Sequence, residues 1–556
     1  MAYTTELKQL IQIIEGTRPE RVARKKAGED FAPMSLENRD SILRQFHPDY
    51  MEEQKRTLKV GPSKGYSLPL ELADLFEAKS RIDPDAVDLT DVEYETDVLI
   101  IGGGGAGTAA ALMAEESGAD VILATKLRHG DANTMMAEGG IQAATKLEKD
   151  SPYYHYLDTL GGGRFKNDPD LVHTLVTEAA DTLQWLESLG CMFFKLPGGR
   201  LQTLPAAGYC RRRLQFAGDI TGTEIMRTMR DESRNRDKIT VLEFSPAVEL
   251  ILNEHGHCSG AVLYNLETEE YFIVKAKAVV MATGGCGRVH IQGFMTTNHY
   301  GATADGLVLA YRAGVELRLL HAIQYHPTGI VFPEQLEGSL ISEKFRASGA
   351  NVVNIDGEQF VYEREPRDVE SAAFIRECME RGKGIVTPTG RLGVWLDSPM
   401  LEQLWGEGAV KQQFPGKYKQ FLRQGIDISE EPMLVYPTLH YQNGGLKYNS
   451  TTESSIPGLY VAGEVGGGVH GENRLMGNSL LDIVVFGRIA GVNSATYAKE
   501  KSKDGKLTLD HVRAYHKEVE ETGAGIDRIS PMVLPDYTDP KVRERQLTAH
   551  YVGTLR

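Results

Sequence analysis

Histidine, arginine and neighbouring polar side chains in a few short segments could together bind a small carboxylic acid. They are His326 in Gln-Tyr-His-Pro-Thr-Gly, His440 in Thr-Leu-His-Tyr, Arg474 in Glu-Asn-Arg-Leu, and Ser342, Glu343, Arg346 and Arg367. A planar guanidinium matches a carboxylate through two parallel hydrogen bonds, and an imidazole can add a further donor. Residues of these types therefore suit a substrate that carries carboxylate groups.

Two ordinary explanations compete with this interpretation. A single histidine is more often a structural residue than a catalyst, so His326 and His440 gain weight only from the motifs around them. Glu343 and Arg346 have the i, i+3 spacing of a common helical ion pair, which by itself implies no chemistry.

A glycine-rich turn is the element that must position a cofactor. Residues 97–101 form a short apolar run typical of a buried strand, and residues 108–116 are alanine-rich and predict a helix. Between them Gly102, Gly104 and Gly107 satisfy G-x-G-x-x-G. In this context the glycines allow a tight turn, approach of the backbone to a pyrophosphate, and close packing of helix on strand.

The second strand of this unit does not fit a simple NAD enzyme. That strand is expected at residues 119–124 and is followed by Thr125 and Lys126 instead of the acid that would bind a ribose hydroxyl. The departure directs attention to a different dinucleotide cofactor.

Six motifs in a fixed order supply a more specific pattern. They are Lys126 to Glu138-Gly-Gly-Ile141, Ala282-Thr-Gly-Gly285, Thr303-Ala-Asp-Gly306, His326-Pro-Thr-Gly329, Val461-Ala-Gly-Glu464 and Asn478-Ser-Leu-Leu-Asp482. Over roughly residues 95–495 the chain resembles the flavoprotein subunits of the succinate dehydrogenase and fumarate reductase family, which includes soluble fumarate reductases and L-aspartate oxidase.

The resemblance implies an α/β fold with a bound FAD. A Rossmann-like FAD-binding domain would be interrupted by an α+β capping domain, with extensions at both ends. The expected boundaries are 1–93 for the N-terminal extension, 94–319 and 437–495 for the FAD-binding domain, 320–436 for the capping domain, and 496–556 for a C-terminal helical segment. The implied FAD contacts are Gly102, Gly104, Gly107, Lys126, Asn133, Gly139, Gly140, Asp305, Glu464, Ser479 and Leu480.

The expected attachment of FAD is non-covalent. Family members with covalent flavin carry a histidine at the position occupied here by Asn133, and His129 lies four residues earlier. Loss of a covalent substituent should lower the flavin potential, which favours delivery of electrons to an alkene.

The resemblance also assigns roles to the carboxylate-binding residues. His440 and Arg474 would hold one carboxylate, and Ser342, backed by His326, would hold the other. Arg367 would give a proton to the substrate carbon after hydride transfer from flavin N5, and Glu343 and Arg346 would relay a proton to it. The expected reaction is interconversion of fumarate and succinate, or of a close unsaturated dicarboxylate, in the reductive direction.

Composition limits the partners and the location. The chain has 556 residues, a formal net charge of −16 and no basic patch, which argues against nucleic acid. The five cysteines contain no C-x-x-C pair, so we expect no metal site or iron–sulfur cluster within the chain and a separate electron donor such as an iron–sulfur subunit. No signal peptide or membrane span is apparent, so we expect a cytoplasmic protein, with association with a membrane or soluble electron-transfer complex left open.

Two other functions stay open from the sequence alone. L-aspartate oxidase has the same fold and similar carboxylate-binding residues, so the motifs separate it poorly from a fumarate reductase. A non-catalytic electron-transfer subunit would be expected to have lost one of these polar residues, and all of them are present.

Overall fold

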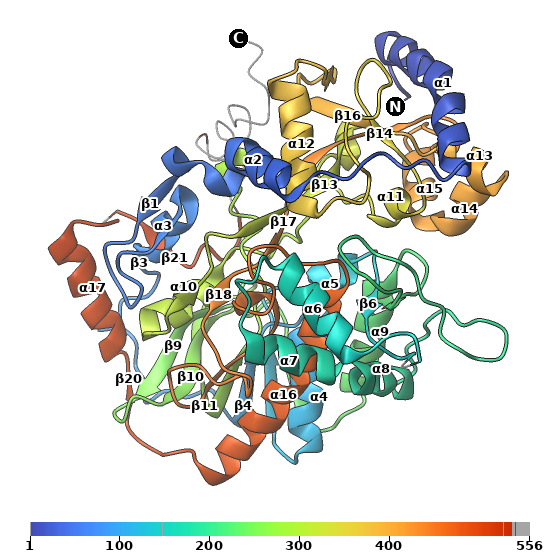
Figure 1. Ribbon diagram of the computed structural model, residues 1–556. Coiled ribbons are helices and arrows are strands. Elements are labelled where there is room, and N and C mark those ends of the chain that lie inside the picture. The colour runs from blue at the N-terminus through green and yellow to red at the C-terminus, as the bar shows by residue number, and fades with distance from the viewer. Residues whose placement is uncertain (1, 147, 526, 536–539, 541–556) are drawn as a thin grey trace.

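A mixed β-sheet forms the lower body of the protein. The computed structural model describes residues 2–146, 148–525, 527–535 and 540 (Figure 1). The sheet has the order β20 (Leu507–Thr508), β9 (Ala247–Asn253), β10 (Cys258–Tyr264), β11 (Tyr271–Met281), β4 (Tyr94–Ile101), β5 (Val121–Ala124) and β8 (Ile239–Leu242), and β19 (Leu459–Val461) pairs with β11. Strands β11, β4, β5, β8 and β19 run parallel, whereas β9 and β10 are antiparallel.

Two long helices pack closely on this sheet. Helix α4 (Gly105–Glu116) follows the glycine turn, and α16 (Asn478–Glu500) lies against it. A Cβ added at Gly487 would lie 2.5 Å from the Ala106 carbonyl oxygen, and one at Gly491 would lie 2.3 Å from that of Ala110. The glycines of α16 therefore allow the two helix backbones to touch.

A second, antiparallel sheet forms the upper body (Figure 1). Its strands are β13 (Ile323–Phe332), β17 (Met433–Gln442), β16 (Leu392–Leu396), β14 (Val352–Val353) and β15 (Ile385–Val386). Its helices are α11 (Lys344–Ala347), α12 (Arg367–Met379), α13 (Met400–Trp405), α14 (Ala409–Gln413) and α15 (Pro415–Leu422). This mixed α/β architecture agrees with the predicted fold class, while the domain boundaries given above stay predictions.

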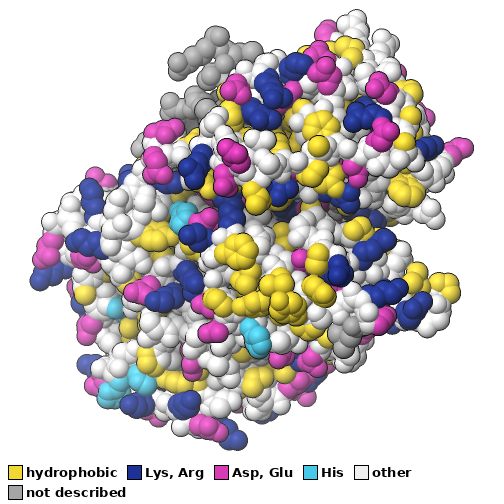
Figure 2. All heavy atoms as spheres, in the orientation of Figure 1, with side chains coloured by type: hydrophobic (Ala, Val, Ile, Leu, Met, Phe, Trp, Pro, Cys, Tyr) yellow, Lys and Arg dark blue, Asp and Glu magenta, His cyan; other side chains and the backbone are white. Residues whose placement is uncertain are grey.

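The remaining elements cover these two bodies. They are α5 (Asn133–Met136), α6 (Pro152–Gly162), α7 (Pro169–Thr177), α8 (Ala179–Ser188), α9 (Thr221–Ser233), α10 (Asp305–Ala313), α17 (Asp510–Thr522), β6 (Ile141–Gln142), β7 (Leu214–Gln215), β12 (Leu317–Arg318), β18 (Gly445–Leu446), β3 (Lys79–Ser80) and β21 (Ile529–Ser530). Among the described residues no helix is both long and apolar enough to cross a membrane. Figure 2 shows hydrophobic side chains gathered over α6, where Tyr153, Tyr154, Leu157 and Phe165 are exposed.

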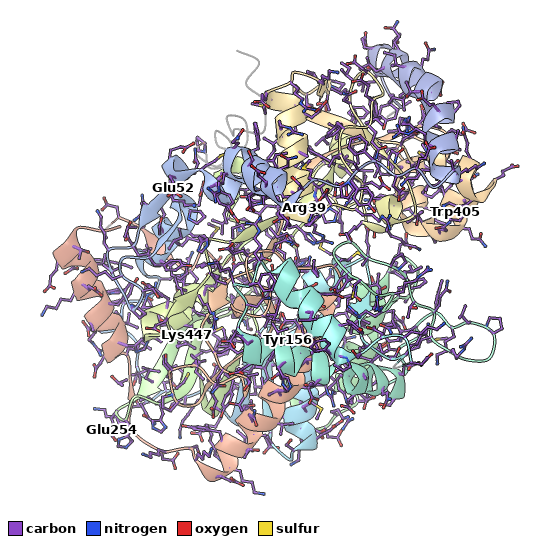
Figure 3. All side chains as sticks on the ribbon, in the orientation of Figure 1. Arg39, Glu52, Tyr156, Glu254, Trp405 and Lys447 are labelled. Atoms are coloured by element: carbon purple, nitrogen blue, oxygen red, sulfur yellow. The ribbon has the colours of Figure 1, made fainter. Side chains whose placement is uncertain are left out.

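The N-terminal segment contains more structure than its sequence indicates. The sequence suggests one short helix near residue 70, which corresponds to α3 (Leu70–Phe76). The structure adds α1 (Thr5–Lys26) and α2 (Leu36–Phe46), both on the upper body, and the strands β1 (Lys55–Thr57) and β2 (Ser67–Pro69). Arg39 of α2, labelled in Figure 3, pairs with Glu365 at 2.8 Å.

Candidate active site

A cavity of about 420 Å³ lies between the two bodies and is lined by residues of both. This volume is within the range of sites for cofactors and small ligands. The predicted site residues that line it are Gly102, Gly104, Lys126, Asn133, Gly139, Gly140, Asp305, His326, Ser342, Glu343, Arg367, His440, Glu464, Arg474, Ser479 and Leu480. Gly107 and Arg346 are not among the lining residues.

The glycine turn is required by packing and opens onto the cavity. Gly102 has φ +120°, and a Cβ there would lie 2.3 Å from the Ala282 carbonyl oxygen. A Cβ at Gly107 would lie 1.8 Å from the carbonyl oxygen of Gly102. Gly104 is the N-cap of α4, so the positive end of the helix dipole faces the cavity and suits a phosphate group.

Lys126 and Asp305 form an ion pair on one wall. The Lys126 Nζ lies 2.5 Å from Asp305 Oδ2 and donates to Thr303 Oγ1 at 2.5 Å. Asp305 is the first residue of α10, where a negative side chain is favoured by the helix dipole.

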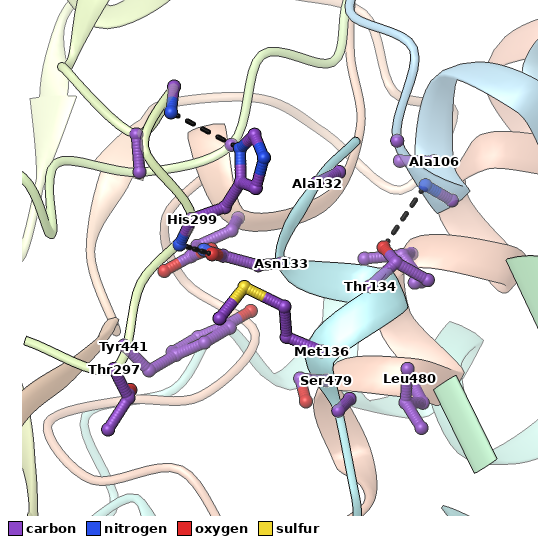
Figure 4. Close-up of a pocket in the computed structure, with 18 of the residues that line it drawn as sticks. Ala106, Ala132, Asn133, Thr134, Met136, Thr297, His299, Tyr441, Ser479 and Leu480 are labelled. Carbon is purple, nitrogen blue, oxygen red and sulfur yellow. Dashed lines mark hydrogen bonds between the residues drawn. The ribbon is translucent and has the colours of Figure 1, made fainter. Parts of the chain in front are cut away.

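Asn133 and Glu464 meet on another wall of the cavity. Asn133 Nδ2 donates to Glu464 Oε2 at 3.2 Å, and the His299 backbone N–H donates to Asn133 Oδ1 at 2.6 Å (Figure 4). The backbone N–H of Gln442 donates to Glu464 Oε1 at 3.0 Å. Burial raises the pKa of Glu464 to about 7. Glu464 can therefore accept a hydrogen bond from a hydroxyl group when ionised and donate one when protonated.

His129 lies away from this cavity. Its side chain is buried, its Nε2 is 3.0 Å from Thr108 Oγ1, and it is not among the cavity-lining residues. His129 is thus placed in the packing beside α4.

The predicted substrate residues meet around the side chain of Gln324. Its Oε1 accepts from Arg367 Nη1 at 3.0 Å and from Arg474 Nη2 at 3.1 Å. Arg474 Nη1 also donates to Ser479 Oγ at 2.9 Å, although the sequence associates Ser479 with the cofactor. Two arginines from separate elements are therefore held side by side by one neutral amide.

The two histidines come together because β13 and β17 are adjacent strands. Leu439 and Tyr441 pair with consecutive residues of β13, which leaves His440 as the extra residue of a β-bulge. The rings of His326 and His440 lie 5.0 Å apart. The bulge therefore brings His440 to the cavity wall beside His326.

Both histidines are held in the neutral form. Burial, followed by the nearby arginine charges, lowers the pKa of His326 and of His440 well below the usual value. His326 Nδ1 accepts the Thr328 N–H at 3.2 Å, so its proton is on Nε2, which has no hydrogen-bond partner among the described residues. His326 therefore has a free donor at the cavity.

Arg474 is a buried cation without an acidic partner. Among the described residues no carboxylate forms an ion pair with it, and its guanidinium lies 4.4 Å from the ring centre of Tyr441. Burial, and then the charge of Arg367, lowers the pKa of Arg474 to about 10, so it remains protonated near neutral pH. A buried cation of this kind is costly unless an anion joins it.

Arg367 leads into a buried chain of charges. Its Nε lies 2.9 Å from Glu343 Oε2, and Arg346 Nη2 lies 3.9 Å from the same oxygen. Burial alone would raise the pKa of Glu343, but Arg367 and Arg346 outweigh it and hold the pKa below its usual value. Arg346 is fully buried and also pairs with Glu370 of α12.

Several residues of the site carry no signal in the sequence. Gln324 stands inside a quoted motif, yet an amide does not suggest that it bridges two arginines. Thr297 Oγ1 lies 2.6 Å from His440 Nδ1, and Asn443 Oδ1 accepts the Arg474 backbone N–H at 3.1 Å. The position of Glu370, three residues after Arg367, is the one hint that it shares a helix face with it.

Comparisons with known proteins agree with this geometry. A family model described as an FAD binding domain matches residues 97–480. A flavoprotein of the fumarate reductase (CoM/CoB) from Methanothermobacter marburgensis is 38% identical over 437 residues, which cover 77% of this chain and 76% of that protein. An L-aspartate oxidase from Streptomyces coelicolor is 36% identical over 415 residues, covering 72% of this chain and 69% of the relative.

A solved structure supports the same relationship. A variant of the E. coli quinol fumarate reductase protein FrdA has a TM-score of 0.69 and 32% identity, and the match covers 77% of this chain and 74% of that one. The fold and the cavity define an FAD-dependent oxidoreductase. The chain belongs to the fumarate reductase and succinate dehydrogenase flavoprotein family, which also contains L-aspartate oxidases.

Proposed function

We propose that this protein reduces fumarate, or a close unsaturated dicarboxylate, to the saturated acid. The observation that carries the proposal is the buried pair Arg367 and Arg474, of which only Arg367 has a carboxylate partner among the described residues. With the neutral His326 and His440 beside them, this end of the cavity has an excess of positive charge. Such an environment suits a dianion.

The side chains of the cavity bind and orient this substrate. His440 and Arg474 hold one carboxylate, and Ser342 with His326 holds the other. FAD, when bound, supplies the hydride that reduces the double bond. Arg367 gives a proton to the neighbouring carbon, and its cationic side chain stabilises the negative charge that develops there.

Glu343 and Arg346 return a proton to Arg367. Their order in space supports this role, because Glu343 Oε2 lies between Arg367 Nε at 2.9 Å and Arg346 Nη2 at 3.9 Å. Burial, as the largest cause, also lowers the pKa of Arg367, which makes its guanidinium a better proton donor than one in water.

FAD is bound without a covalent link. Gly102, Gly104, Gly107, Gly139, Gly140 and Leu480 approach its backbone-facing side, and Lys126, Asn133, Asp305, Glu464 and Ser479 offer polar contacts. Asn133 stands where covalent members have histidine, and His129 is packed beside α4 away from the cavity. Acid precipitation should release the flavin into the supernatant, as read from its absorbance. Flavin that stays with the pellet would contradict this assignment.

L-aspartate oxidation is the second candidate, because relatives of both kinds are similar to this chain. Aspartate adds an ammonium group, which needs an acceptor. Near the arginines Glu343 is the acid that lines the cavity, and its oxygens already accept from Arg367 Nε at 2.9 Å and the Ala207 N–H at 3.1 Å. This arrangement favours fumarate.

A direct comparison of the two substrates tests the proposal. Anaerobic oxidation of reduced methyl viologen should require fumarate, while aspartate under oxygen should release little ammonia. Rapid ammonia release without fumarate-dependent viologen oxidation would replace the first function with the second.

Electrons reach the flavin from a separate protein, such as an iron–sulfur subunit. Within the described part of the chain no group of residues could hold a metal ion, and all five cysteines are unpaired. The apolar patch over α6 supports a protein partner, because contiguous exposed apolar surface often marks a contact site (Figure 2). The cytoplasmic location stays part of the proposal.

A further inference from the structure

Arg164 has an unusual backbone and a central set of contacts. It follows the end of α6, and both Arg164 and Phe165 have φ +58°. Side chains other than glycine rarely adopt this left-handed conformation, and two in a row are retained only where surrounding contacts impose them. The contacts of Arg164 indicate what is gained.

The guanidinium of Arg164 joins three segments that are distant in sequence. Its Nη2 pairs with Asp368 of α12 in a very short contact, and its Nη1 lies 3.7 Å from Glu472 Oε2. Nη1 also donates to the Tyr50 hydroxyl oxygen at 2.7 Å. Burial alone would lower the pKa of Arg164, but its acidic partners, Asp368 first, outweigh this effect and raise it, so the side chain stays charged.

The two acids are next to the substrate arginines along the chain. Asp368 directly follows Arg367, and Glu472 stands two residues before Arg474. Asp368 Oδ1 also accepts the Val369 N–H at 2.8 Å, which fixes its carboxylate to the first turn of α12. The position of Arg164 is thus coupled to the start of α12 in the upper body and to the loop before α16 in the lower body.

Tyr50 brings the N-terminal segment into this contact. It ends a short 3-10 helix, Pro48–Tyr50, and its neighbour His47 packs its buried ring 5.7 Å from that of Tyr325 in β13. The ring of Tyr50 lies 5.9 Å from the guanidinium carbon of Arg164. The segment before residue 93 therefore contacts the upper body and Arg164 at the same place.

We propose that Arg164 is a positioning residue that fixes the separation between Arg367 and Arg474, and that Tyr50 of the N-terminal segment holds Arg164 in place. This inference rests on the proposed function for its effect on turnover. The geometric coupling itself does not depend on the identity of the substrate.

The physical consequence is control of the geometry at the reacting carbon. Gln324 links the two arginines from the cavity side, and Arg164 links their elements from outside. Release of one link lets the arginines separate, and a misplacement of about 1 Å can reduce a rate about 100-fold.

The test compares Arg164→Ala with Arg236→Ala in the FAD-loaded protein. Arg236 is a matched control, because its side chain is 26% exposed against 24% for Arg164 and pairs with Glu115, Glu116 and Glu232 on the far side of α4. Hydrogen exchange of residues 367–371 and 470–475 should be faster in Arg164→Ala than in Arg236→Ala. For fumarate reduction, kcat/KM should fall about 10- to 100-fold in the first variant only.

Two milder variants guard against loss of folding. Arg164→Lys keeps the charge but cannot reach both acids with a planar fork, so it should recover part of kcat/KM. Tyr50→Phe removes one hydrogen bond and should lower kcat/KM a few-fold with unchanged FAD content.

Each outcome is decisive. Equal hydrogen exchange in Arg164→Ala and Arg236→Ala at both segments would overturn the inference, whatever the substrate. Faster exchange at both segments, in a wild type that does not reduce fumarate, would keep the positioning role and overturn the proposed function. Tyr50→Phe that matches wild type in exchange and in kcat/KM would remove the N-terminal segment from the inference.

Discussion

At the scale of residues, the site is defined by charges that are buried and unequally paired. Arg367 has Glu343 at 2.9 Å, whereas Arg474 contacts only neutral groups among the described residues, including Gln324 and Ser479. Burying a cation is unfavourable unless its hydrogen-bond capacity and its charge are both satisfied. The arrangement is therefore stable in function only when an anion is present beside Arg474.

The first prediction concerns the shape of the cation at residue 474. Arg474→Lys keeps the charge and loses the planar fork, so the KM for fumarate should rise about tenfold or more. Steady-state viologen oxidation measures the change. Arg488→Lys, at a surface pair with Asp181, serves as the control and should match wild type. An unchanged KM in Arg474→Lys would remove Arg474 from carboxylate binding.

A second prediction at this scale concerns pH. Burial raises the pKa of Asp49 to about 7, above its value in the unfolded chain. A raised folded-state pKa gives a stabilising contribution that is complete at low pH and is lost as pH rises toward 7. Between pH 5 and 8 the free energy of unfolding of wild type should therefore fall by about 2 kcal/mol relative to Asp49→Asn. Urea unfolding at each pH provides the measurement, with Asp83→Asn, at an exposed position, as control; parallel curves would contradict the shift.

The residue scale also shows how far motifs reach. Sixteen of the predicted site residues line the cavity, because motif spacing already contains the order of strands and turns. Gln324, Thr297 and Asn443 could not be predicted, since neutral polar side chains are common and their partners come from distant segments. Arg164 was invisible for the same reason.

At the scale of elements, local signals and tertiary contacts contribute differently. The turn between β4 and α4 follows from its glycines and apolar flanks, although α4 begins at Gly105, three residues before the expected start. Helix α1 was not predicted, because it contains Pro19 and turns Arg18 and Arg21 toward the protein. An apolar periodicity is weak when the buried face carries charged residues.

The ion pairs of α1 give a third prediction. Arg18 and Arg21 both bind Asp397, at 2.9 and 2.8 Å, and the acid is fully buried. Asp397→Ala leaves two buried guanidiniums without an acid and should cost about 3–5 kcal/mol. Urea unfolding with hydrogen exchange of residues 5–26 would measure it. Asp356→Ala, at a pair with Lys383 that is largely exposed, should cost less than about 1 kcal/mol. Equal costs would show that α1 is not held by this contact.

At the scale of the whole molecule, the site exists only where two bodies and the N-terminal segment meet. The family match covers residues 97–480, while α1, α2 and the segment with Tyr50 lie outside it. Family motifs could therefore predict the class of reaction and the general fold. They could not predict the contact of the N-terminal segment with Arg164, because that contact depends on residues outside the matched region.

The most direct test of the central claim is the anaerobic reoxidation of dithionite-reduced protein by fumarate, followed by flavin absorbance in a stopped-flow instrument. Wild type and Arg367→Ala would be compared at matched FAD content. We predict rapid reoxidation of wild type and a rate at least 100-fold lower in the variant, the usual contribution of a general acid. Equal rates would remove Arg367 as the proton donor, and failure of fumarate to reoxidise wild type would contradict fumarate reduction itself.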